Sequence, residues 1–217
     1  TFTNQLNLTE SHVKEMVRSA NLNTLLSDYF ISGGRFDTWF KYVGRRLSRR
    51  EYPEKEQLED VQRDGYAIRR ILDNGIVPSE RVQLAAVSQN GCVIAYIAQA
   101  GIEPSEKVQL AAVSQDGHAI GFIPEDITLS EPVQLAAVSQ NGSAIDYIFD
   151  AEIEPSEEVQ LAAVSQNGYV IRYIFENDIT PSEEVQLAAV SQYPKAIKYI
   201  PNPSPEVIQA AQNAQNQ

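Results

Sequence analysis

The sequence predicts an all-α solenoid of about six two-helix repeats, preceded by a small helical N-terminal cap. An octapeptide, Val-Gln-Leu-Ala-Ala-Val-Ser-Gln, recurs unchanged at five positions, which begin at Val82, Val108, Val133, Val159 and Val185. The intervals between these starts are 26, 25, 26 and 26 residues. A fixed period of this length is typical of solenoids, whose units bury their apolar faces only against neighbouring units. Each copy also lies between residues that start and stop helices.

We divide the chain into a helical cap or docking segment, residues 1–54, and a repeat array, residues 55–217. The first segment does not fit the period. Its expected helix caps are Thr9, Asn23 or Thr24, and Asp37 or Thr38. Aromatic residues gather there, among them the single tryptophan, Trp39. They indicate either a small core that also caps the first repeat or a docking surface with aromatic anchors.

A basic cluster lies near the end of this segment. It consists of Lys41, Arg45, Arg46, Arg49 and Arg50. One interpretation is a contact with nucleic acid or another anionic surface. The other is charge balance within the molecule, because glutamates and the acidic array follow directly.

One repeat shows why helices are expected. Ser156 is a candidate N-cap, and Glu157 and Glu158 follow in the first turn, where the helix dipole favours negative charge. Asn167-Gly168 ends the helix after ten to twelve residues, and we expect the glycine to adopt the left-handed conformation. A second short helix is expected over residues 169–174. The apolar residues of the first helix cover more than half of its circumference, which predicts burial between neighbouring repeats.

The array has altered units at both ends. A degenerate unit precedes Val82 by one period, and residues 207–211 imitate a first helix before a polar tail. We therefore expect six repeats plus a half-repeat C-terminal cap.

The core Leu-Ala-Ala-Val-Ser-Gln-Asn-Gly, followed by Tyr-Val-Ile-Arg-Tyr-Ile, resembles short α-helical tandem repeats catalogued as a domain of unknown function, with the pattern Leu-x-Ala-Val-x-x-Asn-Gly-x-Ala-Leu-x-Tyr. That family appears in bacterial, effector-like and large-virus proteins, and the resemblance implies a fold but no activity.

Charge is unevenly distributed along the chain. Residues 1–50 hold eight Lys or Arg and four acids, a balance of +4, whereas residues 51–217 hold nine and twenty-five, a balance of −16. An acidic array disfavours direct nucleic-acid binding, because phosphate contacts need Lys and Arg. It fits a basic partner surface, imitation of nucleic acid, or solubility alone.

The sequence favours a cytoplasmic or host-cell intracellular protein. The first twenty residues resemble no signal peptide, and no apolar run reaches the length of a membrane span. The single cysteine, Cys92, excludes an intramolecular disulfide and fits a reducing compartment. An export route without a cleaved signal remains open, as does the oligomeric state.

Two positions after each turn glycine vary between repeats. The position directly after the glycine is occupied by Tyr66, Cys92, His118, Ser143 and Tyr169, with Lys195 in the last unit. The position three residues later is occupied by Arg69, Ala95, Gly121, Asp146, Arg172 and Lys198. A spacing of three places each pair on one helical face, so stacked repeats form a variable stripe. We predict that partners bind there, through Tyr66, Arg69, His118, Asp146, Tyr169, Arg172, Lys195 and Lys198. Free drift at exposed positions is the alternative.

Glutamines recur at two invariant positions. We expect those equivalent to Gln83 to be exposed and to form an interlayer ladder, and those equivalent to Gln89 to bond the neighbouring layer or loop.

No catalytic, metal-binding or cofactor-binding motif is evident. The only histidines, His12 and His118, lie in different segments, and no nucleophile stands with a base and an orienting group. The sequence therefore predicts a non-enzymatic protein-binding scaffold, and the resemblance to the tandem-repeat family adds the expectation of a viral or bacterial factor that engages or inhibits a host or defence protein. An acidic decoy that imitates nucleic acid and a structural component of a larger particle remain as alternatives.

Overall fold

The computed structural model describes residues 52–124 and 127–216. The chain divides after Tyr52, and the second unit, Pro53–Gln217, contains the described helices. The helices expected in residues 1–50, and the basic cluster of Lys41, Arg45, Arg46, Arg49 and Arg50, lie outside the described residues. The described part is an all-α repeat solenoid without strands, as the period predicts.

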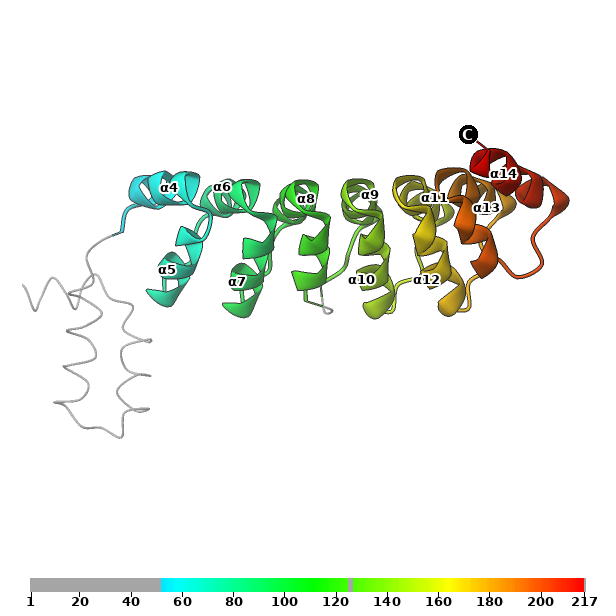
Figure 1. Cartoon of the computed structure of the whole chain (residues 1–217). Helices are drawn as coiled ribbons and strands as arrows, with labels where there is room; N and C mark the ends of the chain where they lie inside the picture. The colour runs from blue at the N-terminus through cyan, green and yellow to red at the C-terminus, as the bar shows by residue number, and fades with distance from the viewer. Residues whose placement is uncertain (1–51, 125–126, 217) are drawn as a thin grey trace, which may run out of the picture. The chain divides into compact units, whose positions relative to one another are not determined.

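In residues 52–124 and 127–216, seven first helices lie side by side in chain order, and each packs on the next (Figure 1). They are α4 (Glu54–Arg63), α6 (Glu80–Gln89), α8 (Glu106–Gln115), α9 (Glu131–Gln140), α11 (Glu157–Gln166), α13 (Glu183–Gln192) and α14 (Pro205–Gln215). We number the repeats one to six by α4, α6, α8, α9, α11 and α13. Helix α14 is the expected half-repeat.

The second segments lie along the other side of this row (Figure 1). Repeat one has α5 (Ala67–Asp73), and repeats two, four and five have a 3-10 turn followed by a short α-helix. These are η2 (Gly91–Val93) with α7 (Ile94–Gln99), η4 (Gly142–Ala144) with α10 (Ile145–Asp150), and η5 (Gly168–Val170) with α12 (Ile171–Glu176). Repeats three and six have 3-10 segments only, η3 (Gly117–Phe122) and η6 (Pro194–Tyr199).

The core is linear and repeats with the sequence. In repeat two, Val82, Ala86 and Val87 of the first helix and Ile94 and Ile97 of the second are fully buried. Each buried isoleucine contributes about 1.5–3 kcal/mol relative to an exposed one. The small alanines allow close approach of neighbouring first helices.

The turn glycine has a different role from the one expected. Gly91 is not left-handed, since the glycines with positive φ in the described residues are Gly75 and Gly101. Instead Asn90 is extended (φ −153°), and its side chain accepts the Cys92 N–H at 3.0 Å, which caps the second segment. A Cβ on Gly91 would lie 2.3 Å from the carbonyl oxygen of Ala112 in the next repeat. The prediction of left-handed closure is wrong, and close packing between repeats explains the glycine.

The first set of invariant glutamines, those equivalent to Gln83, bonds within its own repeat. Gln83 is only 7% exposed, and its Nε2 donates to the carbonyl of Pro78 at 3.0 Å. This bond stays within one repeat and satisfies a buried carbonyl before the helix, so the predicted exposed interlayer ladder is wrong. The same bond recurs at Gln109, Gln134, Gln160 and Gln186.

The prediction for the second glutamine set is confirmed at Gln115, Gln140, Gln166 and Gln192, whereas no such bond is found for Gln89 among the described residues. Gln115 Oε1 accepts the N–H of Gly91 in the preceding repeat at 2.5 Å. Equivalent bonds join Gln140 to Gly117, Gln166 to Gly142 and Gln192 to Gly168. The glutamine and the glycine together therefore determine how closely successive repeats pack.

Candidate partner-binding surface

The variable stripe is held in place by the Asn-Gly or Asp-Gly turns. In repeats one to five, the Asn or Asp side chain accepts the N–H of the first stripe residue. Tyr66, Arg69, His118, Lys195 and Lys198 are exposed, whereas Asp146, Tyr169 and Arg172 are half-buried. The predicted partner-binding residues therefore share one side of the array, but they are not equally accessible.

Several stripe residues contact the cap of the next repeat. Cys92 Sγ lies 3.2 Å from Asp116 Oδ2, and Asn167 Nδ2 donates to Ser143 Oγ at 3.3 Å. Asn141 Nδ2 lies 3.0 Å from Nε2 of His118. Because each residue must match its neighbour, these contacts argue against free drift at those positions.

An aromatic row runs beside the stripe, and the sequence interpretation missed it. It consists of the residues five positions after each turn glycine or its equivalent in repeats two to six: Tyr96, Phe122, Tyr147, Tyr173 and Tyr199. Phe122 is 46% exposed and Tyr147 is 36% exposed. The fixed spacing of these aromatic residues is the sequence signal that identifies the row.

A Tyr/Arg/Lys cluster lies at the C-terminal end of this surface. The guanidinium of Arg172 lies 5.3 Å from the ring centre of Tyr169 and 5.0 Å from that of Tyr173, and Nη1 donates to Tyr169 Oη at 2.8 Å. Tyr169 packs edge-on against Tyr199 of the next repeat, with ring centres 5.4 Å apart. Lys198 Nζ lies 4.6 Å from the ring centre of Tyr199.

Hydrogen bonds in this cluster shift the pKa values of two tyrosines in opposite directions. A hydrogen bond with Lys198 is the main cause that lowers the pKa of Tyr199, and a bond with Tyr169 adds to it. The pKa of Tyr169 is raised, first by its hydrogen bond with Tyr199. The cluster thus presents fixed aromatic faces with two cations beside them.

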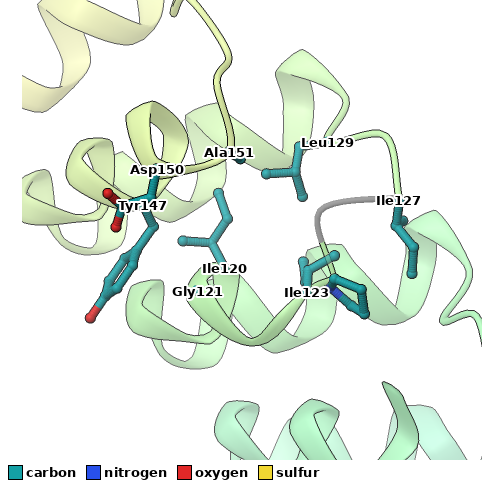
Figure 2. Close-up of a pocket in the computed structure, with 9 residues that line it drawn as sticks. Ile120, Gly121, Ile123, Ile127, Leu129, Tyr147, Asp150 and Ala151 are labelled. Carbon is teal, nitrogen blue, oxygen red and sulfur yellow. The ribbon is translucent and has the colours of Figure 1, made fainter. Parts of the chain in front are cut away.

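The middle of the surface carries the acidic residues Asp146 and Asp150, in contrast to the cations at its C-terminal end. Burial, followed by the neighbouring charge of Asp150, raises the pKa of Asp146. The ring of Tyr147 covers Gly121, where an added Cβ would lie 2.7 Å from Cδ1 of that ring. A pocket of about 260 Å³ lies beside Tyr147 between repeats three and four, as Figure 2 shows.

Cys92 of repeat two lies beside Asp116 and His118 of repeat three. Asp116 Oδ1 lies 3.1 Å from His118 Nδ1, and the thiol donates to the other carboxylate oxygen. Burial, the hydrogen bond to Asp116 and the charge of Asp116 raise the pKa of Cys92 to about 11. The thiol is therefore protonated at neutral pH, the opposite of what a nucleophilic cysteine needs.

A second candidate surface follows the first turns of the first helices. The second position of these helices carries Lys55, Arg81 and Lys107 in repeats one to three. From repeat five onward the same position carries Glu158, Glu184 and Glu206. With Glu157 and Glu183, these three glutamates form an exposed acidic edge.

Comparison of the chain with protein-family models, with curated proteins and with solved structures finds no match. Within residues 52–124 and 127–216, no group of three His, Cys, Asp or Glu side chains is arranged to hold a metal ion. None of the helices in this part of the chain has the length and apolar character of a membrane span.

Proposed function

We propose that this protein is a non-enzymatic repeat scaffold that binds a protein partner through the variable stripe and the aromatic row. One observation carries the proposal: an invariant framework holds a fixed line of aromatic side chains beside positions that change from repeat to repeat. The framework provides an aromatic anchor in repeats two to six, and the stripe provides specificity.

The chemistry of this surface fits a protein partner. Tyrosine and arginine dominate binding energy at protein interfaces, because they bury large areas and still form hydrogen bonds. Here Arg172 is held between Tyr169 and Tyr173, so little side-chain entropy is lost when a partner covers it. Lys198 of the cluster is exposed, and so is the neighbouring Lys195. We infer that the C-terminal end of the surface meets an acidic part of the partner.

The resemblance of the repeat core to tandem repeats of bacterial, effector-like and large-virus proteins extends this proposal. On that basis the scaffold is a viral or bacterial factor, acting in the cytoplasm or inside a host cell, that engages or inhibits a host or defence protein.

The acidic edge favours a second candidate function. Its carboxylates recur at the interval of one helix spacing, and nine Lys or Arg against twenty-four Asp or Glu give Pro53–Gln217 a balance of −15. An acidic decoy would use this edge to occupy a basic groove that otherwise binds nucleic acid. Such binding would be strongly salt-dependent and would compete with DNA or RNA.

Capture from a lysate of the source organism separates the two functions when surface variants are compared. Lys195→Glu with Lys198→Glu alters the C-terminal end of the proposed face, and Glu158→Lys with Glu184→Lys alters the acidic edge. All four positions are exposed, so folding should be retained. The scaffold function predicts a stoichiometric protein that only the lysine changes release. Release by the glutamate changes, together with elution by DNA, would support the decoy and contradict the scaffold.

A further inference from the structure

The second segment of repeat three is short for an identifiable reason. Pro124 occupies the position at which an α-helical residue would donate its N–H to the carbonyl of Ile120. Proline has no N–H, and its ring collides with that carbonyl. The segment therefore remains 3-10, and its last bond runs from Ile123 N–H to Ile120 O at 3.1 Å. Repeat six, which has Pro201 at the same position, is also 3-10 throughout.

The missing helical turn leaves the pocket of about 260 Å³ next to α10. Its apolar walls come from Ile120, Ile123, Ile127, Leu129 and Ala151. Leu129 stands where the other octapeptide repeats have a proline before the serine cap, so this wall is particular to the junction of repeats three and four.

The polar groups lie on one side of the pocket. Figure 2 shows Tyr147 and Asp150 together on that side and Ile123 and Ile127 on the other. Asp150 is exposed, and no ion pair of it is found among the described residues. Asp146, one turn earlier on α10, adds negative charge, and Arg172 of the next repeat lies near it.

We propose that this pocket takes one large apolar side chain from an extended segment of the protein partner, and that Asp150 binds a Lys or Arg next to that side chain. This inference rests on the proposed function and names the partner chemistry at the centre of the surface. An apolar cavity of about 150 Å³ holds benzene, so there is room for a Leu, Met or Phe side chain. Pockets for whole small molecules are larger, roughly 300–1,000 Å³.

A peptide-display library panned on the full-length chain tests the proposal. We expect enriched sequences to pair a large apolar residue with a neighbouring Lys or Arg. A synthetic peptide of the enriched sequence is then titrated by fluorescence anisotropy against variants. Ala151→Trp fills the pocket and should weaken binding by about tenfold or more. Ala100→Trp is the matched control, because Ala100 has the same place in repeat two but lines no part of this pocket.

The charge is tested separately. Asp150→Asn should weaken binding several-fold, and that loss should vanish for a peptide whose basic residue is replaced by Ala. Glu158→Gln removes the same charge from the acidic edge and should have no effect. Leu129→Ala enlarges the pocket and should shift the preference from Leu towards Phe or Trp, which keeps the test valid if Ala151→Trp disturbs folding.

Four results would overturn the proposal. In the first, enriched peptides bind the Ala151→Trp variant normally and fail to bind the Lys198→Glu variant. That result would support the binding face and would rule out the pocket as the site of the apolar side chain. Enrichment without a basic residue would remove the role of Asp150. The pocket would belong to a second copy of the chain if sedimentation showed a dimer that Ala151→Trp abolishes. Absence of any enriched peptide would count against both the pocket and the binding face.

Discussion

At the scale of single residues, glycine at the turn is required by a neighbouring carbonyl and not by its own backbone conformation. Asparagine tolerates the left-handed conformation, so it distinguishes the two roles. Gly101→Asn should change stability by only a few tenths of a kcal/mol, since φ is +72° and nothing lies within 4 Å of the added Cβ. Gly91→Asn should destabilise by about 1–3 kcal/mol through overpacking against Ala112. Urea denaturation followed by circular dichroism compares the two. If the protein tolerated both substitutions equally, the left-handed conformation and not the neighbouring carbonyl would explain the glycine at position 91.

Cys92 gives a pH-dependent prediction. Its pKa lies at about 11 instead of 9.0, so the thiolate fraction at pH 7 should be about a hundredfold below that of an ordinary thiol. Reaction with a disulfide reagent should therefore be slow at pH 7 and should accelerate until about pH 11. Asp116→Asn removes the charge of Asp116, one of the causes that raise the pKa, so it should speed the reaction at neutral pH. Fast labelling of the wild type at pH 7 would contradict this assignment.

The protonated thiol also affects stability. Since the folded state holds the proton more tightly than the unfolded state, the contribution of Cys92 to stability is present below pH 9 and is lost as the pH rises through 11.

At the scale of helices, successive first helices are joined by a bond across repeats. Ser105 Oγ donates to Glu80, the first residue of the preceding first helix. Equivalent bonds join Ser79 to Glu54, Ser130 to Glu106, Ser156 to Glu131 and Ser204 to Glu183. One serine therefore both begins its own helix and ties that helix to its neighbour.

A double-mutant cycle measures this bond. Ser105→Ala with Glu80→Gln should give a coupling energy of about 0.5–1.5 kcal/mol, the usual net value of one hydrogen bond. The equivalent pair Ser182 and Glu157 is the control, because Ser182 caps its own helix through the Val185 N–H and forms no bond to Glu157. Coupling of the same size in both pairs would mean that general electrostatics, and not the hydrogen bond, joins the repeats.

The sequence predicted the first helices well, because their starts and stops depend on local chemistry, as at Ser156 and at Asn167. The sequence did not predict that the side chain of Gln83 is buried, because its burial depends on which side of α6 meets the neighbouring helices. The 3-10 start of the second segments in repeats two to six likewise follows from packing against the next repeat. The pocket needed both Pro124 and the position of Tyr147, which are brought together only by stacking.

At the scale of the whole array, charge divides the repeats into two halves. Residues 53–127 hold six Lys or Arg and twelve Asp or Glu, a balance of −6. Residues 128–217 hold three Lys or Arg and twelve Asp or Glu, a balance of −9. The first position of the first helix is glutamate in all six repeats, so the halves differ mainly at the second position, which is Lys or Arg in repeats one to three, Pro132 in repeat four, and Glu in repeats five and six. Neighbouring glutamates one helix spacing apart, roughly 8–10 Å, repel each other at low salt and are screened above about 0.1 M.

Salt should therefore stabilise one half more than the other. Amide hydrogen exchange read by mass spectrometry should show greater protection of α11, α13 and α14 when sodium chloride is raised from about 10 mM to about 0.5 M, where the Debye length falls well below the helix spacing. The first helices of repeats one to three should change little, because a cation already stands beside each first-position glutamate. Glu158→Lys and Glu184→Lys should remove the difference, since they give the acidic half the same alternation of charge. An equal gain in both halves, unchanged by these variants, would show that salt acts through apolar burial and that the acidic edge carries no repulsion of its own.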